Sequence, residues 1–541
     1  MPKLFPGGRR KRLLCLLFLL VLCVPLVLLY YDTSYISELS PYLPDDFISY
    51  PKGSKGIAQF PSDDSTEILT EQDKDSENDS NTLCEPNECM IGSWKPREPP
   101  FRTLADIKRE YPPSHRGVFK MCGSEENKRA EDSDRNAFHK AQEERLVQVM
   151  NWVWKPRKGR LGTWDAIEFV VRLLKCPGGL IFSGDSITRQ QFQWVEYALA
   201  QADIRVTEDP SHLPSYSHKR LHQFILRPGD QMTAYLKDRA GVPDSRLRRP
   251  IYTKIDNHIL IGEKEVREFS IPLGAKPDFP WYDIFEYFEG WESFVKDAAR
   301  ERGEDGVTED TILVLSTGAH WSRGTWYMLP NTGGVPEQQL RVTIAFRRMI
   351  DLVMSKLDPI PKLSIFYRAT APGHPGCSSS AFYQKFRVNS TIAAQVDGDT
   401  KSRLFVDAET FYTSPYSDGS TAKIAMSNIR EALELSTLDQ QQKLVRSRWD
   451  WDRFEAHNAE WKQAIASREQ LTNGVSSSDR ATWFYMDIWN MALQRPDAHT
   501  QNLVDPSHEN YDCLHWCVPA VVEEWTKYLN HLLFFNRGPN D

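Results

Sequence analysis

The sequence lacks an excess of basic residues, and this limits the partners that the chain can bind. Its 541 residues hold 66 Lys and Arg against 74 Asp and Glu, which gives a net charge of −8. Five basic residues and no acidic ones occupy positions 1–12, so the remainder of the chain is more acidic still. Because nucleic-acid binding depends on basic contacts to phosphates, we expect no nucleic-acid partner.

Long hydrophobic runs are also scarce. One uncharged segment, Leu13–Tyr31, is long enough to cross a bilayer. The basic cluster before it predicts a cytoplasmic tail at 1–12 and a transmembrane signal anchor at 13–31, which contacts the membrane in type II orientation. A cleaved signal peptide is the alternative, although no clear cleavage site follows. Both place the rest of the chain in the lumen of the secretory pathway, and we expect the Golgi.

Cysteine is sparse, with nine residues, and Cys15 and Cys23 lie inside the apolar run. The other seven are disulfide candidates, because they follow the run in a compartment where disulfides form: Cys84, Cys89, Cys122, Cys176, Cys377, Cys513 and Cys517. Seven is an odd number, so at most three intramolecular pairs form and one thiol remains. Asn78 and Asn389 begin N-glycosylation sequons that are usable only in that compartment.

Charge and patterning divide the lumenal part. Residues 32–83 are predicted to form a disordered stem, because 63–79 is dominated by Asp, Glu, Ser and Thr. From residue 84 to 541, short apolar runs alternate with helical patterns, which predicts an α/β fold with a central parallel sheet. The expected strands are 179–183, 311–316, 363–368 and 482–487, and the expected helices are 190–200, 338–357 and 521–534. Two stretches depart from this alternation: about 208–309, interpreted as an insertion or lid, and 434–480, interpreted as a surface helical insertion.

The first chemical motif is Gly184-Asp185-Ser186, which is followed by Arg189 and Gln190. An apolar run ends there and a helical pattern starts, so the Ser186 hydroxyl should lie at a helix N-terminus, where negative charge is favoured. These are requirements for a nucleophile that accepts an acyl group. An N-capped helix with no catalytic role would show the same sequence pattern, and the tripeptide alone is a weak signal.

The second motif is Asp512-Cys513-Leu514-His515-Trp516-Cys517. An Asp three residues before a His on a turn can accept the Nδ1 proton of the His, which leaves Nε2 free to deprotonate a serine. A zinc site at Cys513, His515 and Cys517 is an alternative. It is disfavoured because the spacing is short and lumenal cysteines are usually oxidised.

Two further segments follow expected strands. After 311–316, the Gly318 N–H and the His320 side chain are candidate donors to an oxyanion. After 363–368, Arg368 and His374 are candidates to orient a substrate. Structural roles remain open for His320, Arg368 and His374.

Together these four blocks resemble the PC-esterase group of the SGNH/GDSL superfamily, in particular the trichome-birefringence-like polysaccharide O-acetyltransferases of plants and the capsule O-acetylation proteins of fungi. Cys89-x-x-Gly92-x-Trp94 and Trp152–Pro156 resemble the N-terminal blocks of that family. The resemblance covers roughly residue 84 to the C-terminus and implies a three-layer α/β/α domain. It departs from the plant pattern at Gln190, where Asn is usual, and at Ala319, an extra residue before His320.

The resemblance implies a catalytic Ser186, base His515 and acid Asp512. Gly184, Asp185, Arg189, Gln190, Gly318, His320 and Arg368 are then tentative oxyanion or substrate residues. The implied activity is O-acyl transfer, with acetyl as the group and a glycan hydroxyl as the acceptor. No bound cofactor is expected; acetyl-CoA is a possible donor, and an acetyl-donor transporter a possible partner.

Three other functions stay open. The same three residues would serve a carbohydrate acetyl esterase that uses water as acceptor. A type II glycosyltransferase would need an Asp-x-Asp metal site, and Asp397-Gly398-Asp399 and Asp450-Trp451-Asp452 fit that string. A non-catalytic glycan-binding protein on the same fold is the third, although a complete Ser–His–Asp set disfavours it.

Overall fold

The computed structural model describes residues 82–111, 140, 143–281, 285–300, 303–330, 332, 335–374, 449–472, 479–502 and 510–535. The expected cytoplasmic tail, signal anchor and most of the expected stem lie outside these residues. Within the described ranges, no helix has the length and apolar character needed to cross a membrane. Leu83, expected in the stem, forms an isolated β-bridge with Arg160.

A seven-stranded sheet forms the centre of the fold. In spatial order its strands are β4 (Val206–Glu208), β5 (Leu221–Leu226), β6 (Tyr252–Asp256), β3 (Leu180–Gly184), β7 (Thr311–Ser316), β8 (Leu363–Arg368) and β9 (Thr482–Met486). The five strands from β6 to β9 are parallel to one another. Four of these, β3, β7, β8 and β9, confirm the apolar runs that were expected as strands.

The sheet is mixed: beside the parallel strands of the expected central sheet it has two antiparallel strands at one edge. β4 pairs antiparallel with β5, and β5 pairs antiparallel with β6. The stretch 208–309 therefore builds one edge of the central sheet, and its interpretation as an insertion or lid is wrong. Polar His222 and Gln223 interrupt the apolar residues of β5, and this hid the strand in the sequence.

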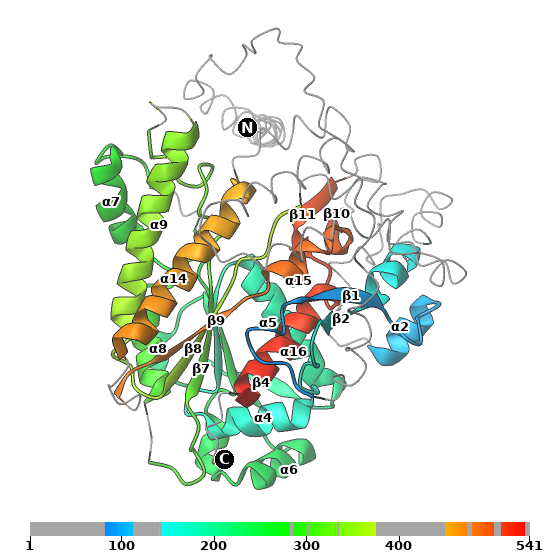
Figure 1. The fold of residues 1–541 in the computed structure, drawn as a ribbon. Coiled ribbons are helices and arrows are strands. Elements are labelled where there is room, and N and C mark those ends of the chain that lie inside the picture. The colour runs from blue at the N-terminus through cyan, green and yellow to red at the C-terminus, as the bar shows by residue number, and fades with distance from the viewer. Residues whose placement is uncertain are drawn as a thin grey trace, which may run out of the picture. The chain divides into compact units, whose positions relative to one another are not determined.

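Helices cover both faces of the sheet, as in a three-layer α/β/α domain (Figure 1). Successive side chains of a strand point to opposite faces. Thus Phe182 and Val314 join one core cluster, while Leu313 and Leu315 join the other. Against the first face pack α4 (Ala166–Lys175), α5 (Ser186–Gln201), α6 (Gln231–Ala240) and α16 (Ala520–Phe535). Against the second pack α7 (Glu263–Ser270), α8 (Trp291–Ala299), α9 (Val335–Leu357) and α14 (Phe454–Thr472).

Helix α14 corrects the interpretation of 434–480 as a surface insertion. Its Trp461 is fully buried and stacks on Tyr367 of β8, with ring centroids 4.2 Å apart. The helix is therefore part of the layer that covers the sheet. Residues 434–448 and 473–478 lie outside the described ranges.

Two antiparallel pairs flank the sheet, β1 (Gly92–Pro96) with β2 (Trp152–Pro156) and β10 (His499–Asn502) with β11 (Asn510–Trp516). Trp94 and Trp154 face each other in the first pair, and Trp94 Nε1 donates to Met491 O. The remaining short elements are α2 (Leu104–Glu110), α15 (Trp489–Leu493) and the 3-10 turns Pro214–Tyr216, Asp244–Arg248, Ile271–Leu273, Trp451–Arg453 and Pro496–Ala498.

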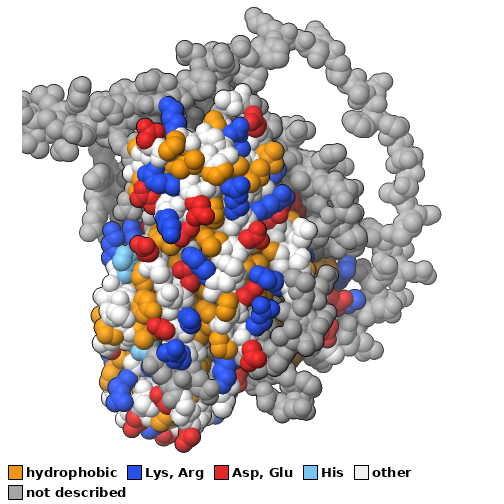
Figure 2. Space-filling model, turned by 90° about the vertical axis from the view of Figure 1, so that its left-hand side faces the viewer, with side chains coloured by type: hydrophobic (Ala, Val, Ile, Leu, Met, Phe, Trp, Pro, Cys, Tyr) orange, Lys and Arg blue, Asp and Glu red, His pale blue; other side chains and the backbone are white. Residues whose placement is uncertain are grey.

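The surface over α7 and α9 carries charges of both signs. Figure 2 shows Lys and Arg side chains interspersed with Asp and Glu on this face. Several of them form ion pairs, such as Arg347 with Glu460 and Arg267 with Glu263. This face therefore carries a mixture of charges and no single dominant sign.

Candidate active site

The carboxyl ends of four strands meet at one edge of the sheet. Gly184, which ends β3, is in register with Asp256 of β6 and Ser316 of β7. Leu315 of β7 is in register with Tyr367 of β8. The segments that follow these strands therefore start side by side, where open α/β sheets bind their ligands.

Ser186 is the first residue of α5, and the turn before it fixes its position. Asp185 is the N-cap: its carboxylate accepts from the backbone N–H groups of Ile187 at 3.0 Å and Thr188 at 3.4 Å. A Cβ on Gly184 would lie 2.4 Å from both Ser316 O and Thr188 Oγ1, so only glycine allows the strand end to approach so closely. Gly184 and Asp185 thus shape the turn that presents the partly exposed Ser186.

The structure brings Ser186, His515 and Asp512 together. His515 Nε2 lies 2.7 Å from Ser186 Oγ, and His515 Nδ1 lies 2.5 Å from Asp512 Oδ2. The other Asp512 oxygen accepts from the backbone N–H groups of Leu514 and His515, both at 3.1 Å. The Asp512 carboxylate is thereby fixed from two sides, and the His515 ring spans the gap between it and Ser186.

The charge on Asp512 determines which atoms donate and which accept in these hydrogen bonds. Burial would raise the pKa of Asp512, but the hydrogen bond and charge of His515 and the two backbone donors outweigh it and lower that pKa to about 2. An ionised Asp512 accepts the Nδ1 proton of His515, so the neutral ring has its lone pair on Nε2. Nε2 can then accept the proton of the Ser186 hydroxyl.

Gln190 holds the strand that carries His515. Its buried side-chain amide donates to Trp516 O at 2.7 Å and accepts from Trp516 N at 2.9 Å. Both ends of this amide are engaged with the residue after His515, so Gln190 ties α5 to β11. The structure gives no support to its tentative role as an oxyanion donor.

Two histidines support His515 from behind, and one of them, His499, was missed in the sequence. His499 Nδ1 lies 3.0 Å from His515 O, and His499 Nε2 lies 2.6 Å from His374 Nδ1. His374 Nε2 in turn lies 2.9 Å from Leu493 O, and its backbone N–H donates to Cys513 O. His374 therefore anchors the β10–β11 pair, and its predicted role as a substrate residue has no support in these contacts.

Arg368 bonds to groups inside the protein, and these contacts give no support to its tentative assignment to substrate binding. It ends β8, is fully buried, and donates to Ile187 O, Gln191 Oε1, Thr188 Oγ1 and Ser316 Oγ at 3.0–3.3 Å. Burial lowers the pKa of Arg368 to about 10, so it keeps its charge at neutral pH. The guanidinium thus binds β7, β8 and the first turns of α5 together beneath Ser186.

Arg189 forms ion pairs with two carboxylates. Its Nε lies 3.2 Å from Asp256, and its Nη2 donates to Glu286. Arg220 pairs with the other oxygen of Glu286 at 2.5 Å. Since Nε and Nη2 of Arg189 are directed at these carboxylates, the contacts give no support to the predicted oxyanion role of its side chain.

Gly318 and His320 lie on the segment after β7. A Cβ on Gly318 would lie 2.1 Å from Thr370 Oγ1, so a glycine is needed where this segment meets the one after β8. The inserted Ala319 is buried in the core, and the next ring, His320, stacks parallel on His258 at 4.0 Å. Burial lowers the pKa of His320, and the nearby charges of Asp185 and His515 shift that pKa in opposite directions.

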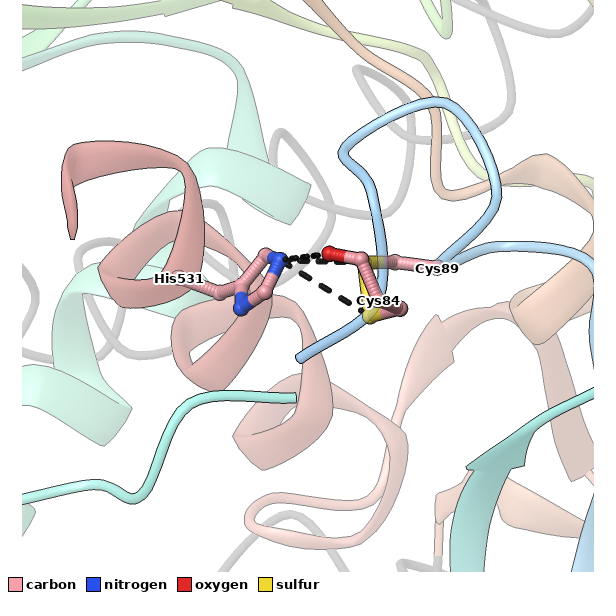
Figure 3. Close-up of side chains that lie close together, drawn as sticks. All are labelled: Cys84, Cys89 and His531. Atoms are coloured by element: carbon pink, nitrogen blue, oxygen red, sulfur yellow. Dashed lines mark hydrogen bonds between the residues drawn. A yellow bond between two sulfur atoms is a disulfide. The ribbon is translucent and has the colours of Figure 1, made fainter. Parts of the chain in front are cut away.

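Within the described residues, one group has the arrangement of a possible metal site, namely Cys84, Cys89 and His531. Cys84 and Cys89 are joined by a disulfide, which confirms two of the disulfide candidates. Figure 3 shows the His531 ring pointing at this disulfide. Its Nδ1 accepts from Gly162 N at 3.0 Å, so Nε2 carries the proton and donates to Cys84 O at 2.9 Å. With the sulfurs oxidised and both ring nitrogens bonded, the three residues form a structural link.

In both metal-dependent alternatives, described residues that would bind the metal already have partners within the protein. Cys513 and Cys517 are disulfide-bonded, so they offer no thiolates to zinc beside His515. Asp450 is buried and accepts from Arg323 Nε at 2.6 Å and Gln339 Nε2 at 3.0 Å. An Asp-x-Asp metal site at Asp450 therefore has no support, and Asp397 and Asp399 lie outside the described residues.

Cys176 is a buried free thiol, and burial raises its pKa to about 12. Cys122, Cys377, Asn78 and Asn389 lie outside the described residues, so their predicted disulfides and glycans remain predictions.

Comparison with known families agrees with the resemblance seen in the sequence. Residues 439–532 match the sequence profile of the PC-Esterase family. This family is described as a GDSL/SGNH-like acyl-esterase family found in Pmr5 and Cas1p. The match includes α14, β9 and the β11 strand with Asp512 and His515, while Ser186 precedes it. Residues 439–532 of this chain are therefore similar to the PC-Esterase family of GDSL/SGNH-like acyl esterases, and this match supports the resemblance seen in the sequence.

Proposed function

We propose that this chain is an O-acyltransferase that moves an acetyl group to glycan hydroxyls through an acyl-enzyme on Ser186. One observation carries the proposal: the hydrogen-bonded path from Ser186 Oγ through His515 to the Asp512 carboxylate, at the ligand-binding edge of the sheet. The match to a GDSL/SGNH-like acyl-esterase family supports acyl chemistry at this path.

In the first half-reaction, Ser186 Oγ attacks the carbonyl carbon of the acyl donor while His515 Nε2 takes its proton. Asp512 stabilises the resulting imidazolium and exchanges no proton itself. The bond from the carbonyl carbon to the donor's leaving group then breaks, and His515 returns the proton to that group. Proton transfer of this kind contributes about 10²–10⁴ in rate.

The tetrahedral intermediate needs donors for its oxyanion. The first N–H groups of a helix have no intrahelical partner, and Asp185 caps those of Ile187 and Thr188, which leaves the Ser186 N–H for this role. The Gly318 N–H is proposed as the second donor. The Arg189 and Gln190 side chains are left out, because their carboxylate and backbone partners already hold them.

In the second half-reaction, His515 deprotonates a sugar hydroxyl, which attacks the acyl carbon on Ser186. The ester bond to Ser186 breaks, and His515 gives the proton back to Ser186 Oγ. The serine is regenerated and the acyl group ends on the glycan. The same residues thus act in both steps, with no redox or metal chemistry required.

An esterase is the second candidate, because the matching family is described as one of acyl esterases. It differs only in that water replaces the sugar hydroxyl in the second half-reaction. We favour transfer because of the resemblance to polysaccharide O-acetyltransferases. On that reading the acyl donor is an activated acetyl compound such as acetyl-CoA. The expected signal anchor at 13–31 would put the reaction in the Golgi lumen, with a transporter that supplies the donor.

Intact-mass analysis of the protein with donor alone tests the proposal. The wild-type chain should gain one acyl group on the peptide that contains Ser186, and Ser186→Ala should gain none. Adding oligosaccharides should discharge the acyl-enzyme faster than water does. Equal rates with and without sugar would identify an esterase, and the absence of an acyl-enzyme would refute both candidates.

A further inference from the structure

The His320 ring is held by contacts with neighbouring rings, while its backbone C=O accepts a hydrogen bond from Thr325 Oγ1. Its imidazole stacks on His258 with an interplanar angle of 5°. His258 is itself fixed: it accepts at Nδ1 from Glu286 N at 3.1 Å, and its Nε2 lies 3.2 Å from the Glu286 carboxylate. Among the described residues, no side chain or backbone group bonds the ring nitrogens of His320. Those nitrogens are available to a ligand at the site.

Trp449 forms the other wall around His320. The two rings meet edge to face, with centroids 5.8 Å apart. Trp449 is 41% exposed, and it is the one tryptophan among the exposed large hydrophobic side chains of the described ranges. A rigid aromatic ring open to solvent beside a polar ring is the arrangement expected of a surface that receives an amphipathic ligand.

The segment that carries Trp449 is anchored to the segment that carries His320. Asp450 accepts from both the backbone N–H and the Nε of Arg323, which lies three residues after His320. On the other side, Trp451 packs so closely on Gly373 that a Cβ there would lie 2.4 Å from its ring. Trp449 is therefore held in place by its neighbours before any ligand binds, which reduces the entropy lost on binding.

We propose that Trp449 and His320 form the subsite that binds the acceptor sugar next to Ser186. The C–H face of a pyranose ring stacks on the Trp449 indole, and a ring nitrogen of His320 hydrogen-bonds a hydroxyl of that sugar. This inference rests on the proposed acyl transfer and adds where the acceptor lies.

The charges around His258 indicate a neutral sugar. Glu286 pairs with Arg189 and Arg220, and Asp256 pairs with Arg189 and Lys254. Each of these cations is already paired with a carboxylate, so none is left to form an ion pair with the carboxylate of a uronic acid. A lipid would need a wide apolar surface, whereas Trp449 is bordered by histidine.

Binding to the Ser186→Ala protein tests the subsite without turnover. The probes are xylotetraose and mannotetraose, two neutral oligosaccharides. Their binding is measured by saturation-transfer NMR and isothermal titration calorimetry. Trp449→Ala added to Ser186→Ala should raise the Kd of the bound probe by about tenfold, and Trp449→Phe by less, because Phe keeps part of the stacking surface. Tyr235→Ala, which removes an exposed aromatic from α6, is the matched control and should leave Kd unchanged.

A kinetic ratio separates this inference from the proposed function. The second test uses the active protein, in which Ser186 is unchanged. There, Trp449→Ala should lower the ratio of kcat/KM for transfer to the tetrasaccharide to kcat/KM for hydrolysis of p-nitrophenyl acetate by about tenfold. If neither probe binds, or Trp449→Ala leaves Kd and this ratio unchanged, the subsite is wrong. If the tetrasaccharide binds through Trp449 but Ser186 is never acylated, the subsite stands and the proposed function fails.

Discussion

Gln190 and Trp516 exchange two hydrogen bonds, from the side-chain amide of one to the backbone N–H and C=O of the other. Gln190 lies one helical turn after Ser186, and Trp516 directly follows His515. The helix that carries the nucleophile is thereby locked to the strand that carries its base. We expect the distance of 2.7 Å between Ser186 Oγ and His515 Nε2 to depend on this lock.

Gln190→Ala should reduce the kcat of acyl transfer by about 10–100-fold and leave KM nearly unchanged, because a small displacement of His515 affects the reacting geometry more than acceptor binding. Gln190→Glu keeps the size of the side chain but cannot donate to Trp516 O, so it should also be impaired. Gln201→Ala, at the exposed end of the same helix, is the control. A Gln190→Ala protein with normal kcat would show that the lock is dispensable.

The three residues of the path should act as one unit. Ser186→Ala and His515→Ala should each abolish formation of the acyl-enzyme, and the double variant should be no worse than either single variant. Asp512→Asn should be less severe than His515→Ala, since Asp512 orients the ring without exchanging a proton. Single-turnover kinetics on folded, secreted proteins would measure this, and additive losses would contradict a shared role.

Arg368 should matter for stability more than for binding. Arg368→Met removes the donors to four buried acceptors and should reduce the free energy of unfolding by about 2–4 kcal/mol, as expected when one partner of a buried charged network is lost. Urea unfolding followed by tryptophan fluorescence would give the change. A variant of unchanged stability but raised KM would restore the substrate role that the sequence suggested.

The two histidines behind His515 predict a loss of stability in mild acid. Burial lowers the pKa of His374 to about 4 and that of His499 well below its ordinary value. The unfolded chain takes up these protons near pH 6.5, so the contribution of His374 to stability is complete above that pH and is lost between about pH 6.5 and 4. His374→Gln should therefore flatten the pH dependence of the unfolding midpoint across this window. An unaltered pH profile would show that His374 is already protonated in the folded protein.

Ser186, Asp512 and His515 were predictable because each lies in a local pattern. The apolar run before Gly184 and the helical pattern after Ser186 indicated the turn, and the spacing of Asp512 and His515 indicated their hydrogen bond. The buried strands β7 and β8 were equally clear, because helices on both faces require continuous apolar runs. In each case, the information lies within about ten residues of sequence.

What the sequence could not show depends on contacts between distant segments. Gln190 and Arg368 looked like polar residues free for substrate, and only the approach of α5 to β11 and β8 reveals their structural partners. His499 belongs to no motif and is identified only by its contacts with His374 and His515. In β5, the polar residues His222 and Gln223 interrupt the apolar pattern that would indicate a strand. That β5 belongs to the sheet is seen only from its antiparallel pairing with β6.

Labelling with a fluorophosphonate probe tests most directly whether Ser186 is the activated nucleophile. Peptide mass spectrometry of the labelled wild-type protein should find the adduct on the peptide that contains Ser186. Labelling should be lost in Ser186→Ala and strongly slowed in His515→Ala, while Ser355→Ala, which removes an exposed serine hydroxyl from α9, should label normally. An adduct on another residue, or none on a folded wild-type protein, would contradict the assignment of Ser186 and His515.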